Sequence, residues 1–315
     1  MRTIPLVDLS TFVHGDTDQR KAFVDQLGKA FHEIGFVGVT GHGISQELID
    51  NFYTAAKAFF SLPVESKRKY ELAGMAGQRG YTSFGKEHAK QSKVADLKEF
   101  FQIGQEVADD DPRKGQYPNN PDVDEAPEFV TLGRQLYRAF EESGANLLRA
   151  IALHLELPEG YFAEKIEAGN SILRAIHYPP ITQEPESAIR AEQHEDINLI
   201  TLLVGASAGG LQLLDKNEEW QEIIPENDEI VINVGDMLQR LTNNYLKSTT
   251  HRVVNPPRKE WHKPRLSIPF FLHPKANMDL SVLSSCVTPE NPEEYAPITA
   301  GEYLDERLRE IGLKK

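Results

Sequence analysis

The chain contains 315 residues, of which 40% are hydrophobic and 26% are charged; this balance is typical of globular enzymes and excludes a largely disordered chain. Its formal net charge of −14 repels phosphate, which argues against a general nucleic-acid-binding protein. Cys286 is the single cysteine, so neither an intramolecular disulfide nor a metal site of several thiolates can form.

Two features of the sequence indicate a cytoplasmic protein without a membrane partner. Residues 1–8 lack the long apolar stretch of a signal peptide. No apolar run approaches the roughly 20 residues that a transmembrane helix needs. The sequence does not indicate an oligomeric state.

The first 165 residues are predicted to be mostly helical. Apolar residues fall three or four positions apart from Phe23 to Ile34 and predict a helix. A short strand is expected over residues 36–39. A second helix is expected to begin after Ser45, its N-cap, and to end before Pro63.

A loop and then a longer helix complete this part of the chain. Residues 104–126 are rich in Pro, Asp and Gly and are predicted to be a loop. From Phe129 to Leu155, apolar residues form a long stripe, which is the pattern of a helix lying against a sheet. We therefore expect a long support helix here.

Short segments rich in β-branched and apolar residues dominate the chain after residue 170. Gly, Asn or Pro separates these segments, which are Ser171–Tyr178, Leu199–Val204, Gly210–Leu214, Glu229–Val234, Thr249–Val254 and Arg265–Leu272. Several short strands separated by turns predict a β-sandwich or barrel. With a last helix over residues 299–311, we expect a single catalytic domain over residues 1–315, with the metal site in a β core over residues 170–290.

Two histidines and an aspartate form a candidate metal site. If residues 193–198 are extended, His194 and Asp196 project from one face, because side chains alternate along a strand. His251 lies in another expected strand. Two imidazoles and one carboxylate on one face of a metal leave its other positions open for substrate and dioxygen, as in non-haem iron(II) oxygenases. Taken alone, each histidine could equally be structural or exposed.

Arg265 and Ser267 form a candidate clamp for a carboxylate. Both lie on one face of the last expected strand, by the same two-residue period. An arginine that points into a barrel is costly unless it is paired. Its guanidinium offers two parallel donors to a carboxylate, and the serine hydroxyl adds a third. The alternative is a structural ion pair between Arg265 and an acidic side chain.

The order His-x-Asp, His and Arg-x-Ser, all in expected strands, resembles the iron(II)- and 2-oxoglutarate-dependent oxygenases, specifically the isopenicillin N synthase-like superfamily. Further segments over nearly the whole chain match this family in the same order. They are Ile4-Pro5-Leu6-Val7-Asp8-Leu9, Phe31-His32-Glu33-Ile34-Gly35-Phe36, Gly41-His42-Gly43-Ile44, Phe59-Phe60-Ser61-Leu62-Pro63, Gly80-Tyr81, Ile176-His177-Tyr178-Pro179-Pro180, Gly209-Gly210-Leu211-Gln212 and Asn233-Val234-Gly235-Asp236.

This resemblance implies a mainly β fold with flanking α-helices, whose core is a double-stranded β-helix (jelly roll). It implies that His194, Asp196 and His251 are the catalytic metal ligands and bind Fe(2+). It also implies an oxidoreductase, a 2-oxoglutarate/Fe(II)-dependent dioxygenase that uses 2-oxoglutarate and O2 as cosubstrates. Such an enzyme oxidises an unactivated C–H bond of a small molecule by hydroxylation, desaturation or cyclisation, and it releases succinate and CO2.

The resemblance assigns the cosubstrate to the clamp. Arg265 and Ser267 are expected to bind the distal carboxylate of 2-oxoglutarate, and Tyr178 is expected to add a hydrogen bond to it. The sequence departs from the family pattern at Ile176, since plant members often have Asn two positions before that tyrosine. Phe271 lies on the Arg265 face if the strand is regular, where it forms either a wall of the substrate pocket or part of the core.

Three basic residues, Arg79, Arg174 and Lys98, are candidates to contact an anionic substrate. The alternative for each is an ion pair or a position at the surface.

Two other kinds of protein are consistent with the motifs. Some family members do without 2-oxoglutarate, such as isopenicillin N synthase and aminocyclopropane carboxylate oxidase. The former carries near its C-terminus a glutamine that can bind the metal, whereas residues 310–315 contain no Gln here. A non-catalytic metal-binding jelly roll, or a metal-dependent isomerase of cupin type, has no need for a carboxylate clamp beside an open metal site.

Overall fold

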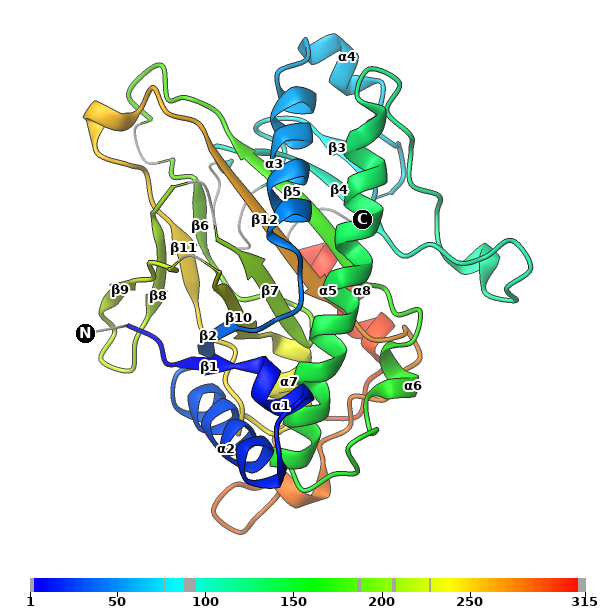
Figure 1. Ribbon diagram of the computed structural model, residues 1–315, viewed down its shortest axis with the longest axis vertical. Helices are drawn as coiled ribbons and strands as arrows, with labels where there is room; N and C mark the ends of the chain where they lie inside the picture. The colour runs from blue at the N-terminus through cyan, green and yellow to red at the C-terminus, as the bar shows by residue number, and fades with distance from the viewer. Residues whose placement is uncertain are drawn as a thin grey trace.

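Two β-sheets flanked by helices make up the computed structural model, which describes residues 3–75, 77–87, 95–185, 188–205, 208–226 and 228–310 (Figure 1). The strands are β1 (Leu6–Asp8), β2 (Phe36–Thr40), β3 (Gly80–Thr82), β4 (Glu99–Gly104), β5 (Ile172–Tyr178), β6 (Ala191–His194), β7 (Ile200–Val204), β8 (Leu211–Leu214), β9 (Trp220–Glu222), β10 (Ile230–Val234), β11 (His251–Val253) and β12 (Arg265–Leu272). The helices are α1 (Leu9–Val13), α2 (Thr17–Glu33), α3 (Gln46–Phe60), α4 (Val64–Arg68), α5 (Pro127–His154), α6 (Ala163–Ile166), α7 (Asp236–Leu241) and α8 (Ala300–Glu310).

The larger sheet has eight strands in the order β1-β2-β10-β7-β12-β5-β4-β3, and the smaller sheet has four in the order β6-β11-β8-β9. β1 and β2 are parallel, whereas β12 pairs antiparallel with both β5 and β7. Strands of both sheets line one cavity of about 870 Å³. Two mainly antiparallel sheets around a cavity are the architecture of a jelly roll.

Helix α5 supports the larger sheet and fixes the position of β12 (Figure 1). Phe140 of α5 stacks on Phe270 of β12, with 5.3 Å between the ring centroids. The helix backbone comes close to the sheet at Gly144, where an added Cβ would lie 2.3 Å from Cδ1 of Leu272. Because interiors are densely packed, this contact leaves β12 little room to shift.

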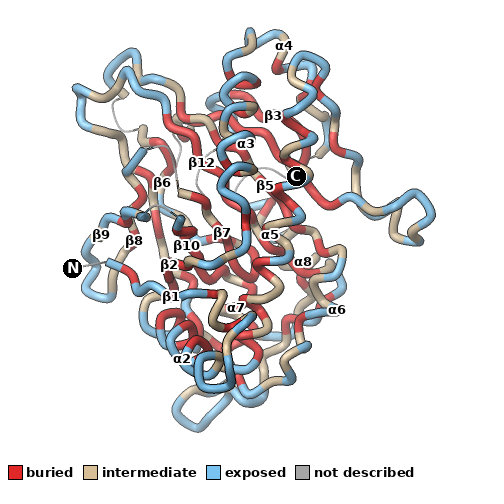
Figure 2. The backbone as a smooth tube through the Cα atoms, in the orientation of Figure 1, coloured by how far each residue is buried: buried red, intermediate tan, exposed pale blue. Residues whose placement is uncertain are grey.

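A cluster of phenylalanines joins the helical N-terminal part to the sheet. The Phe129 ring of α5 stacks on Phe59 of α3, 4.9 Å between centroids, and meets Phe101 of β4 edge-on at 5.1 Å. Each of these rings is at most 1% exposed. Figure 2 shows that the buried residues lie mainly in the sheets and the exposed residues in the outer loops.

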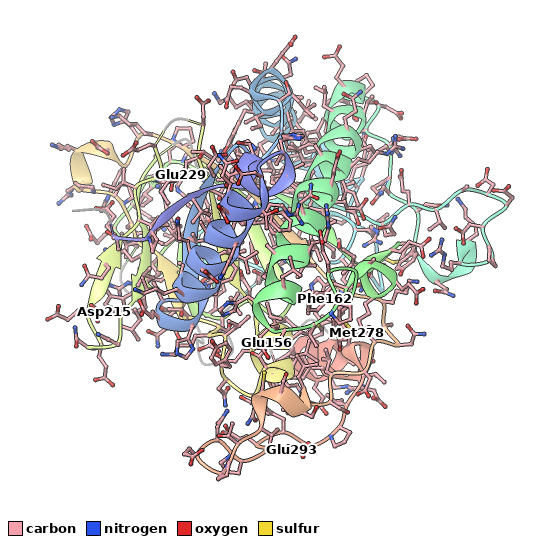
Figure 3. The ribbon with its side chains drawn as sticks, turned by 60° about the horizontal axis from the view of Figure 1, so that its bottom comes forward. Glu156, Phe162, Asp215, Glu229, Met278 and Glu293 are labelled. Atoms are coloured by element: carbon pink, nitrogen blue, oxygen red, sulfur yellow. The ribbon has the colours of Figure 1, made fainter. Side chains whose placement is uncertain are left out.

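The β8–β9 hairpin lies at the edge of the molecule, away from α5, and Asp215 marks its turn in Figure 3. The Asp215 carboxylate accepts hydrogen bonds from the backbone N–H groups of Asn217 and Glu219, at 2.8 and 2.9 Å. This side-chain cap fixes the turn, which is a common role of Asp in loops.

Most of the predicted elements are confirmed. The long support helix is α5, Ser45 accepts a hydrogen bond from the Leu48 N–H as N-cap of α3, and each expected strand of the second half is present within a few residues. Residue 311, the expected end of the last helix, lies outside the described residues, and α8 covers 300–310.

Strands β3 and β4, which lie within the mostly helical N-terminal part, were not predicted. Every residue of β4 is buried, including the polar residues Glu99 and Gln102. Glu99 is stabilised there by Lys67, 2.8 Å away, and by His177, 2.7 Å away. These polar residues interrupt the apolar pattern that would otherwise predict a strand, and their partners come from other elements.

None of the helices in the described part of the chain is long and apolar enough to cross a membrane.

Candidate metal centre and cosubstrate clamp

The structure brings His194, Asp196 and His251 together. Pairing of β6 with β11 places His194 directly opposite His251, with 4.4 Å between the ring centroids. Oδ1 of Asp196 lies 3.9 Å from Nε2 of His194 and 3.8 Å from Nε2 of His251. One possible ligand atom of each side chain lies within 4.8 Å of the other two, so a single ion can be shared by all three.

Backbone carbonyl groups orient both imidazoles. Nδ1 of His194 lies 2.7 Å from the carbonyl oxygen of Glu192, and Nδ1 of His251 lies 3.1 Å from that of Thr249. Because a carbonyl oxygen can only accept, each Nδ1 carries the proton and each Nε2 keeps its lone pair. Burial and the neighbouring His251 lower the pKa of His194 to about 4, so its imidazole is neutral at pH 7.

Two side chains that the sequence analysis missed orient Asp196. Its Oδ2 accepts hydrogen bonds from Oγ1 of Thr201 at 2.6 Å and from Nδ2 of Asn233 at 2.8 Å, which leaves Oδ1 facing the imidazoles. Burial alone would raise the pKa of Asp196, but the two histidines and these hydrogen bonds hold it below its usual range. Asn233 opens a segment that matches the family, and this match was the one signal available in the sequence.

Asp196 reaches the site by a different route from the predicted one. Strand β6 ends at His194, so Asp196 lies beyond it rather than two positions along the same strand. The backbone N–H of Asp236 donates to the Asp196 carbonyl at 2.7 Å and holds the turn. Glu195 accepts a hydrogen bond from the Thr250 hydroxyl at 2.9 Å and is not part of the histidine–aspartate group.

Arg265 and Ser267 lie side by side on β12, and Tyr178 is the partner of Arg265 in β5. All three side chains line the cavity that contains the metal centre. Arg265 is only 2% exposed; its Nε donates to the carbonyl oxygen of Ala208 at 3.0 Å, and its Nη1 is buried without a hydrogen-bond partner. Among the described residues, no carboxylate lies within ion-pair distance of Arg265, so the structural ion pair considered above is not found there.

Of the other candidate basic residues, Lys98 and Arg174 have acidic partners. Lys98 lies 2.7 Å from carboxylate oxygens of both Glu87 and Asp96, and Nη1 of Arg174 lies 3.3 Å from Glu87. Both basic side chains line the cavity. Arg79 is buried outside the cavity wall; its Nη1 donates to the carbonyl oxygen of the preceding residue at 2.8 Å, and its Nε and Nη2 are buried without a hydrogen-bond partner.

Phe271 lines the cavity, which is one of the two positions considered for it on the Arg265 face. The guanidinium carbon of Arg174 lies 5.2 Å from the centroid of its ring. Ile176, which stands in the place of the family's asparagine, also lines the cavity and adds an apolar surface beside Ser267.

Two family models match the chain in succession. The N-terminal model of the non-haem dioxygenases in morphine synthesis matches residues 4–128, and the 2OG-Fe(II) oxygenase superfamily model matches residues 169–274. A 2-oxoglutarate-Fe(II) type oxidoreductase of Aspergillus fumigatus is 30% identical, over 97% of this chain and 92% of the relative. This chain belongs to the 2OG-Fe(II) oxygenase superfamily.

Solved structures of similar proteins agree with this membership. A 2OG-Fe(II) oxygenase family protein from Caulobacter crescentus is 41% identical, with a TM-score of 0.89 over 99% of this chain and 100% of its own. A full-length Neurospora crassa protein in complex with alpha-KG and thymine is 30% identical, with a TM-score of 0.85 over 97% and 96% of the two chains. The predicted jelly-roll core is confirmed.

The oxygenase is therefore an oxidoreductase that depends on Fe(2+) and 2-oxoglutarate. The donor set of the histidine–aspartate group fits ferrous iron, because it supplies two imidazole nitrogens and one carboxylate oxygen and leaves other metal positions open. The unpartnered Nη1 of Arg265 fits the carboxylate of an oxo acid, since buried polar groups need a partner. Family membership argues against a cupin-type isomerase and against a non-catalytic barrel.

Proposed function

We propose that the oxygenase acts as a single catalytic domain in which His194, Asp196 and His251 hold the iron. In the same cavity, Arg265 and Ser267 bind the distal carboxylate of 2-oxoglutarate. The observation that carries this proposal is the buried guanidinium of Arg265, which faces the cavity of the histidine–aspartate group without a carboxylate partner among the described residues. A buried cation without a counter-charge destabilises the fold unless a bound anion pairs with it.

When bound, ferrous iron and 2-oxoglutarate supply dioxygen activation, in which decarboxylation to succinate is coupled to oxidation of the substrate. The side chains of the protein orient the metal ligands and exclude water from the site. Thr201 and Asn233 hold the carboxylate of Asp196 so that one oxygen faces the metal position. The buried walls of the cavity keep bulk water away from the reacting groups.

Tyr178 completes the clamp in this proposal. It is 2% exposed, lines the cavity, and its ring centroid lies 5.1 Å from the guanidinium carbon of Arg265. Its hydroxyl oxygen accepts a hydrogen bond from Arg265, which leaves the hydroxyl proton to be donated to a ligand. The distal carboxylate of 2-oxoglutarate would accept a hydrogen bond from this hydroxyl in addition to those from Arg265 and Ser267.

The substrate of the proposed reaction is a small molecule that lies further along the same cavity, against Phe271 and Arg174. Inward-facing positions of β12 run from Arg265 and Ser267 to Phe271, so the clamp and this end share one wall. Lys98 and Arg174 are already paired with acidic side chains. This balance of charge favours an uncharged polar substrate over an acid.

The test of the iron site compares Asp196→Ala with Glu195→Ala. Purified protein is loaded anaerobically with ferrous iron, and bound iron and succinate formed from 2-oxoglutarate are measured. Asp196→Ala should lose tight iron binding and succinate release, whereas Glu195→Ala, one position away, should keep both. Iron binding and succinate release that survive in Asp196→Ala would contradict the proposed ligand set.

A further inference from the structure

A second buried guanidinium lies behind the clamp. Arg190 directly precedes β6 and is 2% exposed. Its Nη2 donates to the carbonyl oxygen of Lys263 at 3.1 Å, and its Nε is buried without a partner. In the part of the chain that the structure describes, no carboxylate lies within ion-pair distance of Arg190.

Arg190 and Arg265 lie against the same aromatic ring. The guanidinium carbon of Arg190 is 5.8 Å from the centroid of the Tyr178 ring, and that of Arg265 is 5.1 Å from it. Burial and the charge of Arg265 lower the pKa of Arg190 to about 10, so both side chains stay charged at pH 7 and repel each other. The faces of one tyrosine compensate for only a small part of this cost.

The two arginines differ in their access to the cavity. Arg265 lines it, whereas Arg190 is not part of its wall. Arg190 therefore cannot donate a hydrogen bond to a molecule bound there. The charge of Arg190 can still attract an anion that is bound to Arg265, because solvent screens the interaction between buried charges only weakly.

We infer that Arg190 is a positioning residue for the cosubstrate, which increases the preference of the clamp for oxo acids that carry a second, distal carboxylate. A dianionic oxo acid places this carboxylate on Arg265, where it also relieves the repulsion between the two guanidinium groups. An oxo acid without the distal carboxylate gains nothing from Arg190. This inference rests on the proposed role of Arg265.

A purely structural role of Arg190 is the competing explanation. Through Lys263 it ties the start of β6 to the turn before β12, so its loss could loosen the whole site. Such loosening would weaken every oxo acid alike. The two explanations are separated by a pair of ligands that differ only in the distal carboxylate.

The experiment measures dissociation constants by anaerobic calorimetry on the protein loaded with ferrous iron. The ligands are 2-oxoglutarate and 2-oxopentanoate, which has a methyl group in place of the distal carboxylate. Arg190→Met should raise the dissociation constant of 2-oxoglutarate roughly tenfold, as expected for the loss of one charge that acts through a partly screened interior. It should leave 2-oxopentanoate within about twofold of the wild type.

Two further variants guard against misfolding and against loss of the Lys263 contact. Arg190→Gln keeps a hydrogen-bond donor without the charge and should behave as Arg190→Met does. Arg190→Lys keeps the charge and should bind 2-oxoglutarate nearly as the wild type does. Equal weakening of both ligands in Arg190→Gln, or no change in either, would overturn the inference.

Arg265→Met distinguishes failure of this inference from failure of the proposed function. If Arg265→Met weakens 2-oxoglutarate strongly while the Arg190 variants do not, the role of Arg190 is wrong and the clamp stands. If Arg265→Met binds 2-oxoglutarate as tightly as the wild type, the clamp itself is wrong and the inference falls with it.

Discussion

The two ends of the cavity both contain buried basic side chains, but only one end supplies their counter-charges. Lys98 has both Glu87 and Asp96 within ion-pair distance, and Arg174 has Glu87. At the clamp end, Arg265 has no carboxylate partner among the described residues. A buried cation with acidic neighbours belongs to the wall of the cavity, whereas one that lines the cavity without them indicates where an anionic ligand binds.

The largest expected effect separates Arg265 from Arg174, which line opposite ends of the cavity. Arg265→Met should raise the dissociation constant of 2-oxoglutarate at least about a hundredfold, because a buried charged hydrogen-bond partner of the ligand is lost. Arg174→Met, the matched change at the other end, should leave that constant within about threefold of the wild type. Anaerobic calorimetry measures both. Similar losses in the two variants would remove the distinction between the ends.

A large effect on stability is expected at the paired end. Lys98→Met leaves Glu87 and Asp96 without their shared cation in a buried position. We expect the free energy of unfolding to fall by roughly 3 kcal/mol, as is typical when one partner of a buried ion pair is removed. Urea denaturation followed by circular dichroism measures the change. A loss below about 1 kcal/mol would indicate that these pairs behave like exposed ones.

The ion pairs of Glu87 with Lys98 and Arg174 should also make the stability of the protein depend on pH. Burial alone would raise the pKa of Glu87, but Arg174 and Lys98 lower it to about 2. The unfolded chain therefore takes up a proton near the ordinary value, at about pH 4.3, before the folded protein does. The contribution of ionised Glu87 to the free energy of unfolding is fully present at neutral pH and is lost as the pH falls from about 4.3 towards 2. The urea midpoint should drop more steeply between these values in the wild type than in Glu87→Gln; parallel curves would contradict the pairing.

A smaller effect is expected at the hydrogen bonds that orient Asp196. Asn233→Ala should weaken iron binding about tenfold, as is usual when a residue that orients a metal ligand is removed. Thr201→Val should act in the same direction. Its control is Thr250→Val, whose hydroxyl donates to Glu195 and not to a proposed ligand. Competition with a chelator measures the affinity, and equal losses in the two threonine variants would argue against a specific role for Thr201.

The sequence predicted those features whose causes are local. The Ser45 cap, the stripe of α5 and the alternation along β12 each depend on neighbours a few positions apart, and each was confirmed. Strand β4 was missed because Glu99 and Gln102 break its apolar pattern, and the partners that make Glu99 acceptable there come from α4 and β5.

The site was predicted by residue type but not by its supports. Arg265 and Phe271 could be placed on one strand face from their spacing alone. The hydrogen bond from Asn233 to Asp196 joins residues 37 positions apart, and no periodicity relates them. The ion pair of Arg174 with Glu87 likewise depends on tertiary packing, so the sequence alone could not show that Arg174 has an acidic partner and Arg265 has none among the described residues.

The central claim concerns where the iron and the distal carboxylate bind. A crystal structure of the protein prepared anaerobically with ferrous iron and 2-oxoglutarate, with anomalous scattering recorded at the iron edge, tests both at once. The account predicts iron bound by Nε2 of His194, Nε2 of His251 and a carboxylate oxygen of Asp196, with the distal carboxylate on Arg265. Iron bound by other side chains, or a distal carboxylate held away from Arg265, would contradict it.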